Sequence, residues 1–377
     1  MSAEEVKLPL YAKVTIFLVG AFALFAILYI TKSILVPIVF ATLIAIMINP
    51  LVDMLVRIRL NRVLAIAVVM LATFLILFAF VALIISQVSR LSDSWPMLVE
   101  KINSMVNQNI ADAVDYFDKD PQKIQAWITK TQTEIMSSSA AAIGQTLVIV
   151  GSGLVILFLL PVYIFLILFY QPLILEFIHR LFGSDHQNKV TEIVSQIKSV
   201  IQRYLFGLVI EIAIIAVLET TVLLVLGIEY ALLIGFFGAL LNLIPYIGGL
   251  VAVAVPMLVA LVTKPPVYAL YVLIVYYVIQ LIDNNYIVPK IVASKVKINA
   301  LFSIIVVIAG NALWGIPGMF LSIPLLAIVK LICDHIEHLK PVGFLLGDTM
   351  PSILKIKIPN LKIKKGPSVK TDSNKDK

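Results

Sequence analysis

Two acidic residues, Glu211 and Glu219, lie inside the apolar run Tyr204–Leu226. Their separation of eight positions places them about 80° apart around a helix. A charged acid near the centre of a bilayer costs at least about 2.5–3.5 kcal/mol, so both side chains should face the protein interior. A buried carboxyl group can exchange protons or bind a cation, which is the chemistry of an ion-coupled carrier. The alternative is a structural hydrogen bond, which Thr220 and Thr221 could share with Glu219.

A second set of candidates lies where two long apolar stretches, Glu229–Thr263 and Ala300–Ile332, are interrupted by Pro and Gly. Each exceeds the roughly 20 residues that span a bilayer, so each should fold as two shorter helices around an irregular tip. Broken helices with free backbone groups mark the binding sites of many transporters. The alternative is that the tips only make tight turns and close helix contacts. The candidate solute- or ion-binding residues at the tips are Asn242, Pro245, Tyr246, Gly248, Gly249, Gly310, Asn311, Gly315, Pro317 and Gly318.

A third polar group, Asp283, Asn284 and Asn285, follows the apolar run Val267–Ile282. These side chains could line a polar passage between the two broken stretches. They could equally cap the last carbonyl groups of the preceding helix.

Other chemistry has little support in the sequence. His335 and His338 stand beside two acids, but no second cluster accompanies them, so we expect no metal site. The glycines of Leu147–Leu154 lack the Lys-Ser/Thr of a phosphate-binding loop, and no Ser or Cys stands in a recognisable catalytic motif. Cys333 lies in an apolar run and reads as a packed structural thiol. We therefore expect neither an enzyme nor a bound cofactor.

The composition is that of a chain embedded in lipid. Hydrophobic residues make up 61% of the 377 positions and charged residues 14%, whereas soluble domains have about 45–50% and about 25%. The sequence predicts an all-α polytopic membrane protein with six full spans, two Pro/Gly-broken hairpins and a small extramembrane helical insert. The expected full spans are Val14–Thr31, Ile34–Val56, Val63–Ile85, Thr146–Tyr170, Tyr204–Leu226 and Val267–Ile282.

Five regions follow from this pattern. Amphipathic helix patterns identify the insert, and a second amphipathic stretch, Gln171–Arg203, should lie on the membrane or under the helix bundle. The predicted regions are N-terminal spans (1–85), the insert (86–145), central spans with the interfacial helix (146–226), a transport region with both hairpins (227–334) and a basic tail (335–377).

The positions of Lys and Arg predict the orientation. Cytoplasmic loops carry an excess of these residues, so both termini and Asp283–Asn299 should be cytoplasmic and the insert outside. For these segments to share the cytoplasmic side, each broken stretch must either re-enter the membrane from one side or cross the membrane twice. The arms of the first, about 16 and 17 residues, reach roughly 25 Å and favour re-entrant hairpins over short tilted spans. The lysine-rich tail suits an anionic inner leaflet, and no motif suggests nucleic acid as a partner.

Three motifs follow one another in the C-terminal half. They are Leu243-Ile244-Pro245-Tyr246-Ile247-Gly248 with Pro256; Asp283-Asn284-Asn285 with Val288-Pro289-Lys290-Ile291-Val292; and Gly310 to Gly318 with Leu321, Pro324 and Ala327. In their order and spacing over about 100 residues, this half resembles the autoinducer-2 exporter family of bacterial membrane proteins, and the layout of spans and insert matches over nearly the whole chain. Two departures are Lys297-Ile298-Asn299, where many members have Leu-His-Pro, and Asn311, where a second glycine is usual.

The resemblance implies a secondary transporter in the bacterial inner membrane that exports a small molecule, and some members are described as sodium/proton antiporters. The leading interpretation is an ion-coupled carrier of a small polar solute. The alternatives are a Na⁺(Li⁺)/H⁺ antiporter and a non-transporting membrane scaffold. The expected partners are the lipid bilayer and a small molecule or monovalent cation, and analogy with other carriers is compatible with a homo-oligomer.

Overall fold

The computed structural model describes residues 9–79, 82–83, 85–86, 100, 104, 159–182, 187–244, 248–292 and 298–349. These residues are almost entirely helical, and their β-structure is limited to an isolated bridge between Ile298 and Gly347. The predicted all-α class is confirmed. Most of the predicted insert (86–145) and the tail beyond position 349 lie outside the described residues.

Six of the described helices are long and apolar enough to cross a membrane. Five of them overlap predicted spans, whereas the sixth, Ile316–His335, belongs to the second predicted hairpin, and most of the predicted span Thr146–Tyr170 lies outside the described residues. A further apolar helix, Leu159–Phe169, continues into α5 (Gln171–Leu181) with a bend of 60°. None of the residues of α1 is buried, so this predominantly apolar helix presents its side chains to the surroundings. The six helices are α1 (Leu10–Ile30), α2 (Lys32–Arg57), Arg62–Ala79, α6 (Gln187–Val225), α9 (Val267–Ile282) with the π-helix Asp283–Val292, and α11 (Ile316–His335).

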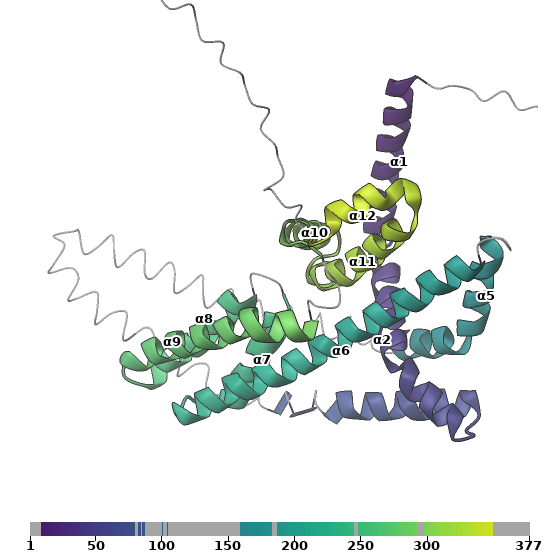
Figure 1. The fold of residues 1–377 in the computed structure, drawn as a ribbon. Helices are drawn as coiled ribbons and strands as arrows, with labels where there is room; N and C mark the ends of the chain where they lie inside the picture. The colour runs from purple at the N-terminus through teal and green to yellow at the C-terminus, as the bar shows by residue number, and fades with distance from the viewer. Residues whose placement is uncertain are drawn as a thin grey trace, which may run out of the picture.

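Helix α6 is the element against which most of the others pack (Figure 1). It has 39 residues and is about 58 Å long, nearly twice the thickness of a bilayer core. The structure differs here from the expected separation of an interfacial stretch, Gln171–Arg203, from the span that begins at Tyr204. The segment from Gln187 to Tyr204 contains neither Pro nor Gly, so nothing ends the helix at that boundary.

Both interrupted stretches form pairs of packed helices, as the sequence predicts. The first pair is α7 (Ala231–Asn242) with α8 (Gly248–Thr263), and the second is α10 (Ala300–Trp314) with α11. The second pair is joined at Gly315, whose φ of 66° is a conformation that side chains other than glycine rarely adopt. Helix α11 has 20 residues and is long enough for a full span, whereas the other three arms are shorter.

Small residues bring α10 and α11 into close contact. A Cβ at Gly310 would overlap with the Gly318 carbonyl group and the Ser322 hydroxyl group. The Ser322 hydroxyl oxygen lies 2.6 Å from the Gly318 carbonyl oxygen and 2.9 Å from that of Val306, within hydrogen-bond distance of both. Close backbone approach of this kind is how membrane helices pair tightly.

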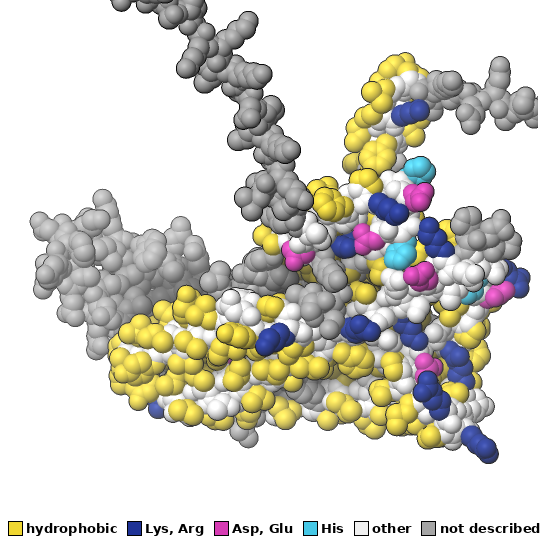
Figure 2. Space-filling view, in the orientation of Figure 1, with side chains coloured by type: hydrophobic (Ala, Val, Ile, Leu, Met, Phe, Trp, Pro, Cys, Tyr) yellow, Lys and Arg dark blue, Asp and Glu magenta, His cyan; other side chains and the backbone are white. Residues whose placement is uncertain are grey.

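Hydrophobic side chains dominate the visible surface along α6 to α9, whereas charged side chains gather toward α5, α11 and α12 (Lys340–Leu346) (Figure 2). A surface of this kind suits contact with lipid, with the charged groups at the interface or beyond it. The short helix Glu337–Leu339 connects α11 to α12.

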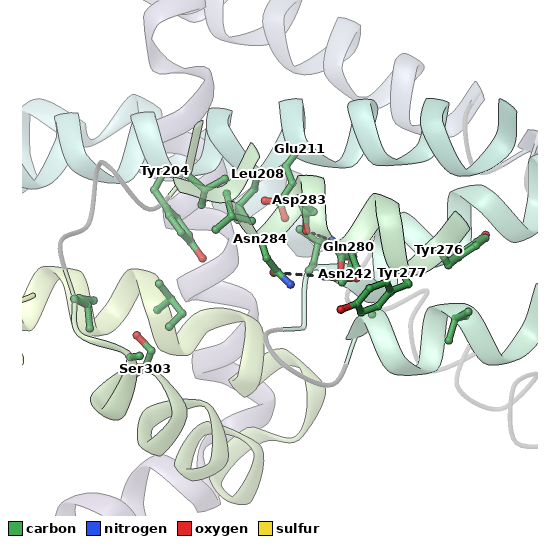
Figure 3. A pocket seen from close by; sticks show the side chains of 18 of the residues that line it. Tyr204, Leu208, Glu211, Asn242, Tyr276, Tyr277, Gln280, Asp283, Asn284 and Ser303 are labelled. Atoms are coloured by element: carbon green, nitrogen blue, oxygen red, sulfur yellow. Dashed lines mark hydrogen bonds between the residues drawn. The ribbon is translucent and has the colours of Figure 1, made fainter. Parts of the chain in front are cut away.

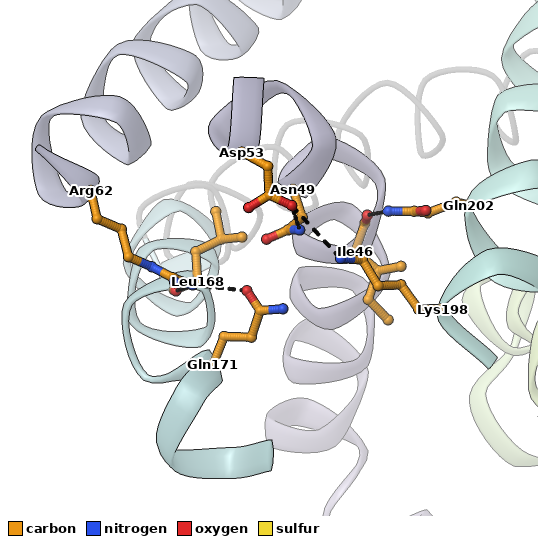
Figure 4. Close-up of polar contacts among 8 residues, drawn as sticks. All are labelled: Ile46, Asn49, Asp53, Arg62, Leu168, Gln171, Lys198 and Gln202. Carbon is orange, nitrogen blue, oxygen red and sulfur yellow. Dashed lines mark hydrogen bonds and ion pairs between the residues drawn. The ribbon is translucent and has the colours of Figure 1, made fainter. Parts of the chain in front are cut away.

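A polar contact joins α2 to α6 (Figure 4). Pro50, inside α2, has no N–H group and so leaves the Ile46 carbonyl without its helical donor. The Gln202 Nε2 atom of α6 donates to that carbonyl at 2.7 Å. Nearby, Asn49 donates to Asp53 at 2.7 Å, and the Lys198 ammonium group lies 3.9 Å from the same Asp53 oxygen. This cluster fixes the position of α6 relative to the N-terminal helices.

The first prediction concerns this link. Gln202→Leu keeps the size of the side chain but removes the donor, so the Ile46 carbonyl loses its partner. We expect the folded state to lose about 1–3 kcal/mol, measured by thermal unfolding of the full chain in detergent micelles. Gln196→Leu is the matched control, because Gln196 donates only to Glu192 within α6. Equal melting temperatures for the two variants would contradict the assigned role of Gln202.

Candidate functional site

A cavity of about 700 Å³ lies where α6, α7, α9, the π-helix and the start of α10 come together (Figure 3). Its volume falls within the range of about 300–1,000 Å³ that is typical of small-molecule sites. The wall combines aliphatic side chains with a limited set of polar and aromatic ones. The polar and tyrosine side chains in the wall are Tyr204, Glu211, Asn242, Tyr276, Tyr277, Gln280, Asp283, Asn284, Ser303 and Asp348.

Two buried carboxyl groups face the cavity close to each other. Glu211 comes from the middle of α6 and Asp283 from the first residue of the π-helix, and Figure 3 shows the two groups side by side. Glu211 is 6% exposed and Asp283 is 2% exposed. Two buried negative charges are costly without a proton or a positive charge to compensate them, so the pair is a candidate for binding either.

Asp283 is held at one oxygen only. Its Oδ2 atom accepts a hydrogen bond of 2.7 Å from Asn242 Nδ2 at the end of α7. Its buried Oδ1 atom has no hydrogen-bond partner among the described residues. The π-helix widens the backbone at this position, and such segments are frequent at functional sites. The free oxygen is therefore available to a ligand.

Glu219 does not line the cavity but lies behind its wall. It is 4% exposed and packs against α7, where a Cβ at Gly238 would overlap with its Oε2 atom. Tyr276 lines the cavity, and its hydroxyl group lies near the Glu219 carboxyl group. The two groups are close but do not have the geometry of a hydrogen bond, and Glu219 Oε2 has no other partner among the described residues. Tyr276 thus separates this second acid from the cavity.

The structure brings five of the candidates from the sequence to the cavity and places the other described candidates elsewhere. Asn285 donates to the Leu281 carbonyl group of its own helix, and Gly248 packs on the Leu241 carbonyl group. Pro245 and Tyr246 lie outside the described residues. The five in the wall are Glu211, Asn242, Gly249, Asp283 and Asn284, and the candidates elsewhere include Glu219, Gly310, Asn311, Gly315, Pro317 and Gly318.

The tip of the second hairpin contacts α1 rather than the cavity. Trp314, beside Gly315, donates from its indole nitrogen to the Leu28 carbonyl group at 2.9 Å. The α10–α11 pair contributes to the cavity through other residues, including Ser303 near the start of α10 and Ile323 in α11. The two tips therefore do not meet at one site.

Several wall residues were not selected from the sequence. Tyr204 and Tyr277 stand in apolar runs, where a tyrosine reads as part of the core or of the membrane interface. Gln280 belongs to the polar end of α9 and carried a weak signal. Asp348 follows the last described helix, and no local pattern connects it with residues that precede it by more than 100 positions. Only the folding of the chain shows that these residues share a site.

Metal binding has no support in the described part of the chain. No group of three or more His, Cys, Asp or Glu side chains there could hold a metal ion. The His335 Nδ1 atom lies 2.8 Å from the Leu331 carbonyl oxygen of its own helix.

The second prediction tests the contact between Asn242 and Asp283. Asn242→Leu leaves both oxygens of the buried Asp283 carboxyl group without a donor, so the folded state should lose about 1–3 kcal/mol. The melting temperature in detergent measures this loss. The control, Asn285→Leu, changes an exposed asparagine in the same region and should leave the melting temperature close to that of the parent chain. The double variant Asn242→Leu/Asp283→Leu should recover stability, and failure to do so would show that the lost donor is not the cause.

Comparison with known proteins gives a family match and several relatives. The sequence matches the AI-2E family transporter description over residues 16–338, which is nearly the whole chain. A putative transport protein of Bacillus subtilis, YrrI, is 23% identical over 317 residues, covering 82% of this chain and 88% of that protein. The AI-2 transport protein TqsA of Escherichia coli is 25% identical over 335 residues, covering 84% and 90%.

A third relative has a higher sequence identity to this chain, over a shorter region. YueF, a putative transport protein of Bacillus subtilis, is 33% identical over 107 residues, which is 28% of this chain and 29% of that protein. The family match over nearly the whole chain, together with the helical membrane fold, shows that this chain belongs to the AI-2E family of membrane transporters.

Proposed function

We propose that this protein is a secondary transporter that exports a small polar solute through the cavity between α6, α7, α9 and α10, driven by an ion gradient. The observation that carries the proposal is the pair of buried carboxyl groups, Glu211 and Asp283, in the wall of a cavity of about 700 Å³. A solute of moderate size fits the volume, and the carboxyl groups supply a place for a coupling ion.

The coupling follows from the cost of buried charge. When a proton or a monovalent cation occupies the carboxyl pair, the negative charge of the cavity is compensated. When it leaves, the site favours another cation or a rearrangement that admits water. Alternating exposure of the site to the two sides requires one group of helices to move against another. The interrupted pair α7–α8 borders the cavity at Asn242 and Gly249, so a movement of this pair would change access to it.

A Na⁺(Li⁺)/H⁺ antiporter is the second candidate. The observation that favours it is the charge of the wall, where the described residues include acids but no Lys, Arg or His. In this case the carboxyl pair would bind the transported ions themselves.

The third prediction separates the two candidates. Liposomes containing the purified full chain and internal dyes for pH and Na⁺ receive a panel of small polar solutes, and in separate trials NaCl and LiCl. The proposed solute transporter changes the internal pH or the internal Na⁺ concentration when a solute is added, whereas the antiporter responds only to the inorganic cations. The absence of any response beyond that of empty liposomes would contradict both proposals.

The fourth prediction concerns Glu211 in the same assay. Glu211→Gln keeps the shape of the side chain but cannot release a proton, so the dependence of flux on pH should disappear while the folded protein is retained. Glu192→Gln is the control, because Glu192 is exposed near the start of α6 and away from the cavity. An unchanged pH profile in Glu211→Gln would assign Glu211 a structural role.

The proposed orientation places both termini and residues 283–299 in the cytoplasm of a bacterial inner membrane, with the insert outside. The fifth prediction tests this with single cysteines introduced in a Cys333→Ser background and labelled by a membrane-impermeant reagent. Positions 2 and 375 should be protected in intact cells, and position 120 should react. Labelling of position 120 and position 375 from the same side would contradict this topology.

A further inference from the structure

The charged side chains among the described residues of the cavity wall are all acidic. Glu211, Asp283 and Asp348 contribute three carboxyl groups, and the described wall residues contain no Lys, Arg or His. Asp283 is almost fully buried and has one oxygen without a partner, so its charge is not compensated by the described protein groups. A negative group in this position attracts a cation and repels an anion.

The rest of the wall is suited to an organic ligand rather than to a bare inorganic ion. Aliphatic side chains such as Leu208, Val253 and Leu273 supply apolar surface, and Tyr204 and Tyr277 supply aromatic surface. A monovalent inorganic ion needs only a few oxygen ligands and would leave most of the 700 Å³ unfilled. Tyrosine rings also attract cations through their electron-rich faces.

Asp348 is held beside the start of α10 by a set of hydrogen bonds centred on Asn299. The Asn299 backbone N–H donates to the Leu346 carbonyl group at 3.0 Å. The Asn299 side-chain amide donates to the carbonyl groups of Leu345 at 2.7 Å and of Gly347 at 3.1 Å. The next residue, Asp348, is exposed and contributes to the cavity wall. An exposed acid at the edge of a negative cavity raises the local concentration of cations.

We propose that the substrate of this cavity is a small organic cation, such as a protonated amine or a quaternary ammonium compound with an apolar body. Asp283 and Glu211 bind the positive charge, the tyrosines and aliphatic side chains contact the body, and Asp348 attracts the ligand at the entrance. The transport of this ligand rests on the proposed function, but its binding is a property of the cavity and is measured separately.

The binding experiment compares two ions of almost the same shape and opposite charge, tetraphenylphosphonium and tetraphenylborate. Equilibrium dialysis with the full chain in detergent should show saturable binding of the cation and none of the anion. Detergent micelles without protein correct for partition of both ions. Equal saturable binding of the two ions, or no saturable binding of the cation, would overturn the inference.

Substitutions at the two ends of the site locate the binding. Asp283→Asn should weaken cation binding at least about tenfold, because a buried charge pair is lost. Asp348→Asn should weaken it by about threefold, and Asp348→Glu should preserve it, because this exposed charge is screened by solvent. Asp348 is exposed, so its variants should fold even if Asp283→Asn does not. Glu192→Gln is the control and should bind as the parent chain does. Unchanged affinity in Asp348→Asn would remove Asp348 from the inference, and unchanged affinity in a folded Asp283→Asn would overturn it.

The hydrogen bonds of Asn299 to the Leu345, Leu346 and Gly347 carbonyl groups, here called the Asn299 clamp, have their own test. Asn299→Pro is compatible with the local φ of −74° but removes the backbone donor and the side-chain amide. If the clamp positions Asp348, this variant should weaken cation binding by the same factor as Asp348→Asn, and the combination of both should give no further loss. Independent, additive losses would show that the clamp does not act through Asp348.

The flux assay then distinguishes a failed inference from a failed function. Cation-selective binding without any solute-driven flux would contradict transport and leave the inference in place. Flux of a neutral or anionic solute that tetraphenylphosphonium does not inhibit would support transport and overturn the inference.

Discussion

The hydrogen bond from Asn242 to Asp283 is the contact on which the arrangement of the cavity depends. It joins the end of α7, where the first hairpin breaks, to the start of the π-helix, where the long helix after Val267 changes its pitch. A buried carboxyl group needs a donor, and a broken helix needs partners for its terminal groups. The Asn242 amide group is the donor for the Asp283 carboxyl group, and the bond fixes the end of α7 relative to the start of the π-helix. It also leaves the second oxygen of Asp283 free for a ligand.

Close approach to α6 makes this arrangement possible. Gly207 lets the Ile291 carbonyl group of the π-helix lie directly against α6, since a Cβ there would come within 2.7 Å of that oxygen. Gly238 leaves room for the Glu219 carboxyl group between α6 and α7. In a membrane, where apolar burial between helices gives little driving force, such packing is a main source of stability. Gly207 and Gly238 thus allow α6 to pack closely against the π-helix and α7, while Glu211 and Glu219 remain buried in α6.

The two hairpins, although similar in sequence pattern, serve the cavity in different ways. The break of the first lies at the cavity, whereas Gly315 of the second lies next to Trp314, which is bonded to α1. The tight contact of Gly310 with Gly318 makes the second pair a compact unit. Its contribution to the site comes from the start of α10, the body of α11 and the segment after α12. The first hairpin therefore borders the cavity at its break, whereas the tip of the second is packed away from the cavity.

The sequence alone determined the helical membrane class, the two interrupted stretches and the family, because these depend on local properties: long apolar runs, helix-breaking residues and a continuous motif. It also identified Glu211, because an acid inside an apolar run is unusual, and Asp283, because it begins a polar group at the end of one. Only the tertiary structure decided which candidates share a cavity. Asp348 joins Glu211 and Asp283 through contacts between segments more than 60 positions apart, and Gly315 is excluded by the packing of α10 and α11. Such contacts depend on how whole helices cross, and no local pattern of residues specifies that.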